Sequence, residues 1–139
     1  MQRVVLTIRG RQLYEDQEPE VVELVTEGTM SKLDNGWNIA YEESALTGLE
    51  GVKTFFEVEP GKITLLRTGK LQSKMVFQVG VPHESLYQMD FGAILISVCA
   101  IDMGYELSEK GGTVELAYRI EIEHGPGGIV EYSLDVKPK

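Results

Sequence analysis

Hydrophobic and polar residues alternate with a period of two along much of this chain. Between Thr113 and His124 every second residue is apolar, and most of the residues between them are charged. The segment from Val130 to Val136 repeats the alternation. A β-strand with one buried face and one solvated face requires this pattern. The two segments therefore predict two strands of an antiparallel sheet.

The segment from Lys62 to Met103 extends this architecture. It reads as four consecutive strands, separated by Gly69, by Gly80 with Pro82, and by Gly92. Short β-rich runs that are interrupted by glycine and proline are typical of an antiparallel meander.

The rest of the chain follows the same theme and predicts about ten strands. No stretch of ten or more residues has convincing helical periodicity, and no linker divides the chain. We therefore predict an all-β fold, with residues 1–139 forming a single antiparallel meander β-barrel of about 8–10 strands. Closure removes exposed edge strands, and a barrel of about eight strands can hold one small ligand. The predicted strands span residues 4–9, 21–30, 37–42, 52–59, 62–68, 70–79, 84–91, 93–103, 113–124 and 130–136.

Four glycine-containing segments predict local features of the backbone. Asp34-Asn35-Gly36 predicts a tight primed turn, because Asn-Gly supplies positive φ angles, and Pro60-Gly61 predicts a type II turn. Gly28 predicts a bulge or bend inside its strand. The run from Gly125 to Gly128 predicts the loop between the last two strands.

Two segments differ from the alternating pattern. Residues Ala93 to Met103 are apolar on both faces, so we expect both faces to be covered by a loop, another subunit or the barrel wall. The segment from Glu43 to Gly51 contains two glycines and predicts a longer loop. This loop is a candidate lid over one mouth of the barrel.

Glycines, aromatic residues and one arginine also recur in an arrangement that resembles a known family. They are Arg67-Thr68-Gly69, Met75-Val76-Phe77, Gly80, Tyr87 and Phe91-Gly92, with Tyr41-Glu42-Glu43, Lys53-Thr54 and Gly61-Lys62-Ile63 upstream. This set resembles the YwiB-like family of small bacterial proteins, and the resemblance covers nearly the whole chain. It implies a lipocalin-like (calycin) β-barrel. The family is uncharacterised, so the resemblance implies no activity.

The charge of the chain argues against two classes of partner. There are 13 basic and 22 acidic residues, a net charge of −9. Binding to a nucleic-acid backbone or to anionic lipid depends on clustered Lys and Arg, so we expect neither. No apolar run approaches the ~18–20 residues of a membrane span. The single cysteine, Cys99, lies in an apolar run and is compatible with a reducing compartment, so we expect a cytoplasmic protein.

No motif in the sequence carries a reaction. The two histidines, His83 and His124, lie in different turn regions, and neither a His-x-x-x-His nor a Cys-x-x-Cys pair indicates zinc. There is no Gly-x-Ser-x-Gly motif. The glycine-rich run 125–128 lacks the Lys-Ser/Thr of a phosphate-binding loop. We therefore predict no catalytic residue, no metal site and no cofactor, and we favour a protein that is not an enzyme.

Arg67 is the residue that we single out. The parity that buries Ile63 and Leu65 also points the Arg67 guanidinium into the barrel, where it must be paired or near water. One interpretation is a structural ion pair with Glu42 or Asp90, and a second is exposure at the strand end.

The third interpretation of Arg67 is functional. Arginine binds carboxylate and phosphate groups bidentately, so Arg67 is a candidate anchor for an internal ligand. Its candidate polar neighbours on adjacent strands are Tyr41, Tyr87, Gln88 and Ser73.

Two hypotheses for the function follow. The first is a non-catalytic cytoplasmic barrel that binds a small, partly apolar, anionic ligand. The alternative is a protein–protein interaction module or homodimer with a filled barrel core, favoured by the doubly apolar segment 93–103. An internal cavity with convergent polar groups would favour the first, and a filled barrel with an exposed apolar patch would favour the second.

Overall fold

The structure is a computed structural model that describes residues 1–13, 18–43, 50–89 and 91–139. These residues form ten β-strands and no helix, so they contain no helix with the length and apolar character needed to cross a membrane. The strands are β1 (Gln2–Leu13), β2 (Glu20–Lys32), β3 (Trp37–Glu42), β4 (Val52–Glu59), β5 (Lys62–Gly69), β6 (Leu71–Phe77), β7 (Pro82–Met89), β8 (Gly92–Ser108), β9 (Gly111–Ile122) and β10 (Gly125–Pro138).

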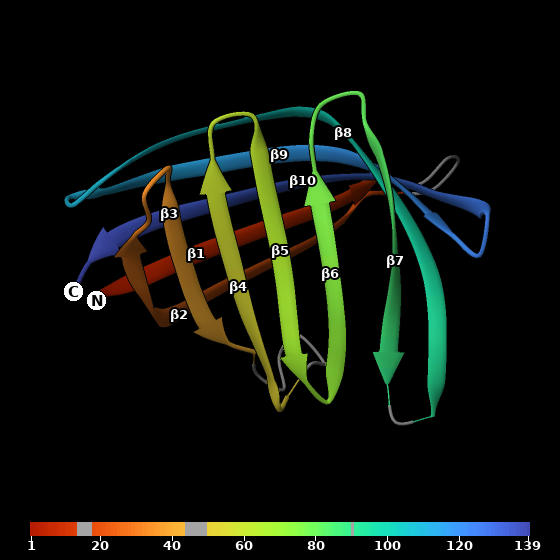
Figure 1. The fold of residues 1–139 in the computed structure, drawn as a ribbon, viewed down its shortest axis with the longest axis horizontal. Coiled ribbons are helices and arrows are strands. Elements are labelled where there is room, and N and C mark those ends of the chain that lie inside the picture. Colours follow the sequence, from red (N-terminus) through yellow and green to blue (C-terminus); the bar gives the residue numbers. More distant parts are fainter. Residues whose placement is uncertain (14–17, 44–49, 90) are drawn as a thin grey trace.

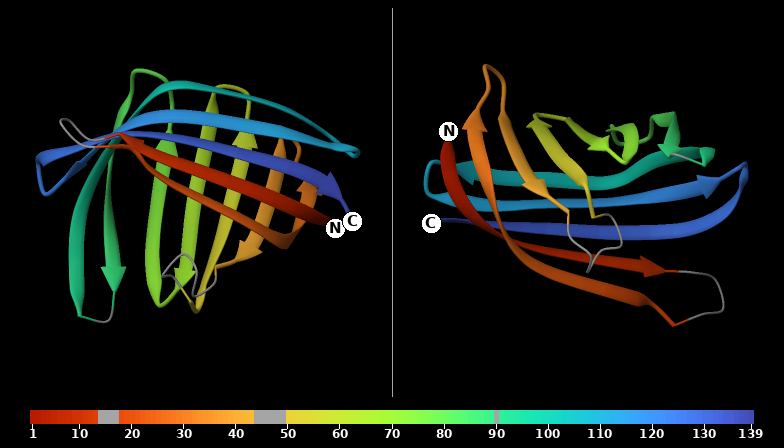
Figure 2. Two further views of the ribbon diagram at one scale, coloured as in Figure 1. Left: turned by 180° about the vertical axis from the view of Figure 1, so that it is seen from behind. Right: turned by 90° about the horizontal axis from the view of Figure 1, so that it is seen from below.

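The strands form a closed antiparallel barrel. Each strand pairs with the next along the chain, and β1 pairs with β10 to close the ring, with Val4 opposite Pro138 and Leu13 opposite Ile129. The short strands β3–β7 run steeply across the long strands β1, β2, β9 and β10, which gives the barrel two layers (Figures 1 and 2). The predicted all-β meander barrel is confirmed.

Gly28 lies where β2 passes from one layer to the other. β2 pairs with β1 in an unbroken register from Met30 to Glu20 but pairs with β3 only from Gly28 to Lys32. Of the two features predicted for Gly28, a bulge or a bend, the unbroken register excludes the bulge. Glycine is needed at this position because β2 and β3 approach each other closely. A Cβ atom on Gly28 would lie 2.4 Å from the carbonyl oxygen of Ala40.

Two of the predicted turns have a different geometry. The connection from β9 to β10 is a two-residue turn at Glu123 and His124, which have φ angles of 51° and 64°. The glycine-rich run that follows belongs to β10, whose register with β9 shifts between Pro126 and Ile129. The predicted loop at Gly125 to Gly128 is therefore wrong, because two non-glycine residues adopt the left-handed conformation instead.

The hairpin at Asp34-Asn35-Gly36 forms, but without the primed turn. Lys32 pairs with Trp37, and the Leu33 N–H donates to the Gly36 carbonyl at 2.8 Å. Neither Asn35 nor Gly36 has a positive φ. A Cβ on Gly36 would lie 1.8 Å from the Val58 carbonyl oxygen, so close approach again explains the glycine. Gly61, with a φ of 75°, has the positive φ predicted for a type II turn.

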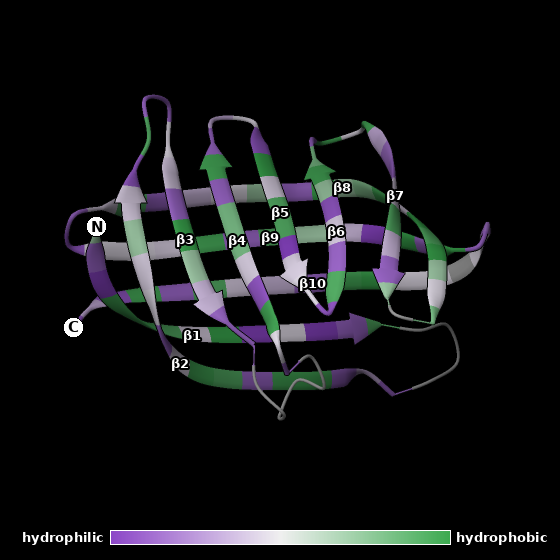
Figure 3. Ribbon diagram, turned by 60° about the horizontal axis from the view of Figure 1, so that its bottom comes forward, coloured by the Kyte–Doolittle hydropathy of each residue, from purple (hydrophilic) through white to green (hydrophobic). Residues whose placement is uncertain are grey.

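The middle of the barrel is filled with side chains. Inward positions of the strands are apolar and outward positions are mostly polar, which appears as alternating colour along the ribbons in Figure 3. Burying these side chains supplies the main driving force for folding. The largest fully buried side chains are Phe77, Leu6, Met30, Ile39, Ile63, Met75 and Leu134.

The apolar strand β8 is buried more deeply on its inner face than on its outer face. Ile96, Val98 and Ala100 are buried inside the barrel. On the outer side Leu95 and Cys99 are half-buried, and Ile101, at a register shift against β9, is 45% exposed. The expectation that both faces are covered therefore holds for the inner face alone. Residues 44–49 of the predicted lid lie outside the described residues.

Candidate functional site

A row of polar side chains crosses the inner face of β3 to β6. Tyr41 lies opposite Thr54, Thr54 opposite Arg67, and Arg67 opposite Ser73. Residues directly opposite each other on antiparallel strands bring their Cβ atoms to about 4.5–5.5 Å. The register of four strands therefore places these polar groups in one line inside an otherwise apolar barrel.

The Arg67 guanidinium is only partly satisfied by this environment. Its Nη1 donates a hydrogen bond to the Tyr87 hydroxyl at 2.9 Å, and that hydroxyl contacts the Met75 sulfur at 3.8 Å. Within the described part of the chain, Arg67 Nε and Ser73 Oγ are buried and have no hydrogen-bond partner. A buried polar group without a partner costs about 1–3 kcal/mol, so the Arg67 Nε atom, whose side chain lines a pocket, favours a bound polar group.

The charge on Arg67 is retained despite its burial. Burial acts to lower the pKa of Arg67, but Tyr87, Tyr132, Tyr41 and Glu43 act to raise it, and the net direction is upward from the ordinary value. Glu43 is the carboxylate among these neighbours. The site therefore presents a guanidinium to the inside of the barrel.

Glu43 follows β3 and lies beside this row. The buried Thr54 hydroxyl donates to Glu43 Oε1 at 2.8 Å, and Thr54 is directly opposite Arg67. The Glu43 side chain is itself buried, with 8% of the residue exposed. The site thus combines one cationic and one acidic side chain across a single strand.

Two tyrosines from opposite sides of the barrel meet next to these residues. The hydroxyls of Tyr41 on β3 and Tyr132 on β10 lie 3.2 Å apart, and the Phe56 ring packs against both tyrosine rings. In a hydrogen bond between two hydroxyl groups, only one of the two hydroxyl hydrogens lies between the oxygens. The other hydroxyl hydrogen is therefore available to donate to a ligand.

These side chains surround a small pocket of about 120 Å³. Apolar residues of β1 and β2 form part of its wall, and Val22, which is 55% exposed, lies at its rim. For scale, an apolar cavity of about 150 Å³ holds one benzene molecule. The pocket thus has room for a ligand of about six non-hydrogen atoms. Its lining residues are Ile8, Gly10, Val22, Leu24, Tyr41, Glu43, Arg67 and Tyr132.

The structure brings together four of the five predicted site residues. Arg67, Tyr41 and Ser73 share the polar row, and Tyr87 is bonded to Arg67. Gln88 does not join them, because it is exposed and neighbours on a strand point to opposite faces. Because side chains alternate between the two faces of β7, Gln88 must face away from the side of the sheet that Tyr87 faces.

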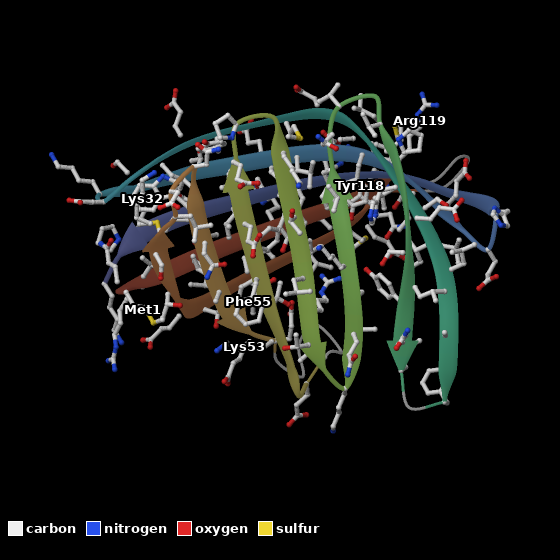
Figure 4. The ribbon with its side chains drawn as sticks, in the orientation of Figure 1. Met1, Lys32, Lys53, Phe55, Tyr118 and Arg119 are labelled. Carbon is white, nitrogen blue, oxygen red and sulfur yellow. The ribbon has the colours of Figure 1, made fainter. Side chains whose placement is uncertain are left out.

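The predicted ion-pair partners of Arg67 also need correction. Glu42 is exposed and lies opposite Lys53 on the outer side of the barrel, where Lys53 Nζ is 5.3 Å from the Phe55 ring (Figure 4). Asp90 lies outside the described residues. The acidic residue that reaches the inside is Glu43, which sequence reasoning missed although it has the same parity as Tyr41. Tyr132 was missed as well, because its place beside Tyr41 depends on barrel closure.

In the described part of the chain, three larger hollows are open to solvent, and two of them carry less specific chemistry. One, of about 480 Å³, lies on the outer face of β8, β9, β10 and β1. Its arginines already have acidic neighbours, since Arg9 is 2.7 Å from Glu23 and Arg11 is 3.9 Å from Glu131. The lining of the other, of about 520 Å³, includes Met103, Tyr105 and two valines at the β6–β7 connection. No cluster of three His, Cys, Asp or Glu side chains that could hold a metal occurs among the described residues.

Buried tyrosines predict a loss of stability at alkaline pH. Burial raises the pKa of Tyr132 to about 12, and it raises the pKa values of Tyr41 and Tyr118 further. In the unfolded chain tyrosine ionises near pH ~10. Above that pH the unfolded state releases protons that the folded state keeps, so the free energy of unfolding should fall as pH rises from about 10 to 12.

Urea unfolding at a series of pH values measures this effect. The contribution of these tyrosines to the free energy of unfolding should be fully present below about pH 10. As pH rises above that value, a Tyr118→Phe variant should lose less stability than the unmodified protein. Equal pH dependence of the two proteins would show that Tyr118 does not contribute.

The chain matches a known protein family over most of its length. The model of a domain of unknown function (DUF1934) matches residues 6–135. The chain belongs to the DUF1934 family. The uncharacterized beta-barrel protein YwiB of Bacillus subtilis (strain 168) is 25% identical over 122 residues, which cover 87% of this chain and 84% of YwiB.

The similarity extends to a solved structure. The crystal structure of ywiB protein from Bacillus subtilis matches with a TM-score of 0.89 at 22% identity, covering 99% of this chain and 92% of the other. The YwiB-like family and the β-barrel fold are therefore confirmed. The finer likeness to lipocalins and other calycins stays a prediction, because YwiB is described only as an uncharacterized beta-barrel protein.

Proposed function

We propose that this barrel binds a small, partly apolar molecule with a carboxylate group in the Arg67 pocket, without catalysing a reaction. The observation that carries the proposal is the buried Arg67 Nε, which has no partner within the described residues although its side chain lines a pocket. A carboxylate accepts hydrogen bonds from arginine with favourable geometry. The apolar wall formed by Ile8 and Leu24 suits a short hydrocarbon portion.

The small volume limits the ligand. The middle of the barrel is occupied by side chains such as Phe77 and Met75, which are 0% and 1% exposed. This part of the barrel therefore has no room for a long-chain hydrophobic ligand. The proposal is for a ligand of about six non-hydrogen atoms, by comparison with the cavity that holds benzene.

Isothermal titration calorimetry with propionate tests the proposal. Propionamide is the matched control, because it has nearly the same shape without the charge. We expect propionate to bind one site per chain at least about tenfold more tightly than propionamide, since hydrogen bonds to a charged group contribute about 1.5–3 kcal/mol. Equal affinities of propionate and propionamide would count against the proposal.

A second candidate is an interaction module or homodimer with a filled core, and one observation favours it. On the outer side of the β7–β8 hairpin, Leu86 lies opposite Leu95 and is 49% exposed, and Ile101 is 45% exposed. Apolar patches of this kind can mark protein interfaces. A sedimentation measurement that shows only a monomer across the accessible concentration range would contradict the homodimer. The expected cytoplasmic location stays a prediction.

A further inference from the structure

The pocket that contains Arg67 also contains an acidic residue. Arg67, Glu43, Tyr41 and Tyr132 all line the same space of about 120 Å³. A ligand with only a negative charge would meet the guanidinium favourably and the Glu43 carboxylate unfavourably. Like charges within a poorly solvated site repel strongly, because the effective dielectric constant is low. The chemistry of the lining therefore constrains the ligand beyond its carboxylate.

We propose that the ligand is a small zwitterion, with a carboxylate directed to Arg67 and an ammonium group directed to Glu43. This inference rests on the proposed function, since it concerns the same pocket and keeps the carboxylate. The two charged side chains lie on either side of Thr54, which is opposite Arg67 in the sheet and donates a hydrogen bond to Glu43 at 2.8 Å. A short molecule can therefore reach both.

The size and remaining polarity of the pocket fit this class of ligand. A free amino acid such as alanine has six non-hydrogen atoms, which matches the space available by comparison with a benzene-sized cavity of about 150 Å³. The spare hydrogen of the Tyr41–Tyr132 pair can be donated to a carboxylate oxygen. Ile8, Val22 and Leu24 can contact a short aliphatic side chain.

Electrostatic complementarity predicts which molecules bind less tightly than a zwitterion. Propionate lacks the ammonium group and leaves Glu43 facing a second carboxylate. Lactate replaces the ammonium with a hydroxyl, so it keeps a hydrogen-bond donor but loses the positive charge. Both should bind more weakly than alanine, because specificity arises from unfavourable contacts with the wrong ligand as well as from favourable contacts with the right one.

Titration calorimetry at neutral pH with alanine, propionate and lactate tests the inference. We expect alanine to bind the unmodified protein at least about tenfold more tightly than either of the others. In a Glu43→Gln variant, which keeps the shape of the side chain, alanine should lose affinity and propionate should gain it. The lactate comparison uses the unmodified protein and therefore does not depend on whether the variant folds.

The outcomes separate this inference from the proposed function. If propionate binds as tightly as alanine and lactate, the zwitterion is wrong, while carboxylate binding at Arg67 stands. If none of the three binds the folded protein, both proposals are wrong. A reversed order of alanine and propionate in Glu43→Gln would support the assignment of Glu43 to the ammonium group.

Discussion

Replacing Phe77 with alanine is expected to lower the free energy of unfolding by about 3–5 kcal/mol. Phe77 is fully buried, lies opposite Ile63 on β5, and packs its ring 4.7 Å from the Tyr118 ring of β9. It therefore joins the two layers of the barrel. Removing the ring loses buried apolar surface and leaves a cavity between strands that are already fixed by closure.

Urea unfolding of the variant measures this loss. A change in the midpoint at a constant slope reports stability alone. Phe91→Ala is the matched control, because Phe91 is 84% exposed, and it should change stability by no more than about 0.5 kcal/mol. A loss below about 1 kcal/mol for Phe77→Ala would show that the barrel core is not packed as described.

Replacing Arg67 with methionine is expected to separate binding from stability. Propionate affinity should fall by at least about tenfold, because the charged hydrogen-bond donors are lost. The free energy of unfolding should change by no more than about 1 kcal/mol. Methionine fills much of the space of the arginine chain, and the desolvation cost of a buried guanidinium with an unpartnered Nε disappears.

A structural role for Arg67 predicts the opposite result. Breaking a buried ion pair by removing one partner costs about 3–5 kcal/mol, so a loss of that size would show that Arg67 mainly maintains the fold. Arg119→Met is the matched control, since Arg119 is exposed on β9 (Figure 4). That variant should retain both propionate binding and stability.

Alternation along the chain was sufficient to predict most of the strands and the inward direction of Arg67. Period two is a local property of a strand, so the face shared by Ile63, Leu65 and Arg67 can be read from the residues themselves. The same rule shows why Tyr87 and Gln88 cannot both face inward. The Gln88 prediction failed because it was chosen for its polarity rather than its parity.

Other parts of the site depend on distant segments. Tyr132 meets Tyr41 only because β1 pairs with both β2 and β10, which alternation along one strand does not specify. Glu43 lies one residue beyond β3 and was assigned to a loop. Its place beside Arg67 becomes visible only through the Thr54 hydrogen bond and the shared pocket.

Turn geometry was the least predictable feature of the fold. Glu123 and His124 form the tight turn that the glycine-rich run after them was expected to form. The Glu123 carboxylate accepts a hydrogen bond from the Leu95 N–H at 2.8 Å, and the Glu123 N–H donates to the Leu95 carbonyl at 2.8 Å. Contacts with β8 thus compensate for a backbone conformation that glycine adopts more easily.

The central claim is that the Arg67 Nε–H is a buried donor that a carboxylate ligand satisfies. Nuclear magnetic resonance of the arginine Nε–H groups tests this most directly, because the chain has five arginines and an Arg67→Met variant assigns the signal. We predict that the Arg67 signal alone shifts progressively and saturates as a carboxylate ligand, alanine or propionate, is added. An Arg67 signal that neither ligand changes would contradict carboxylate binding at Arg67.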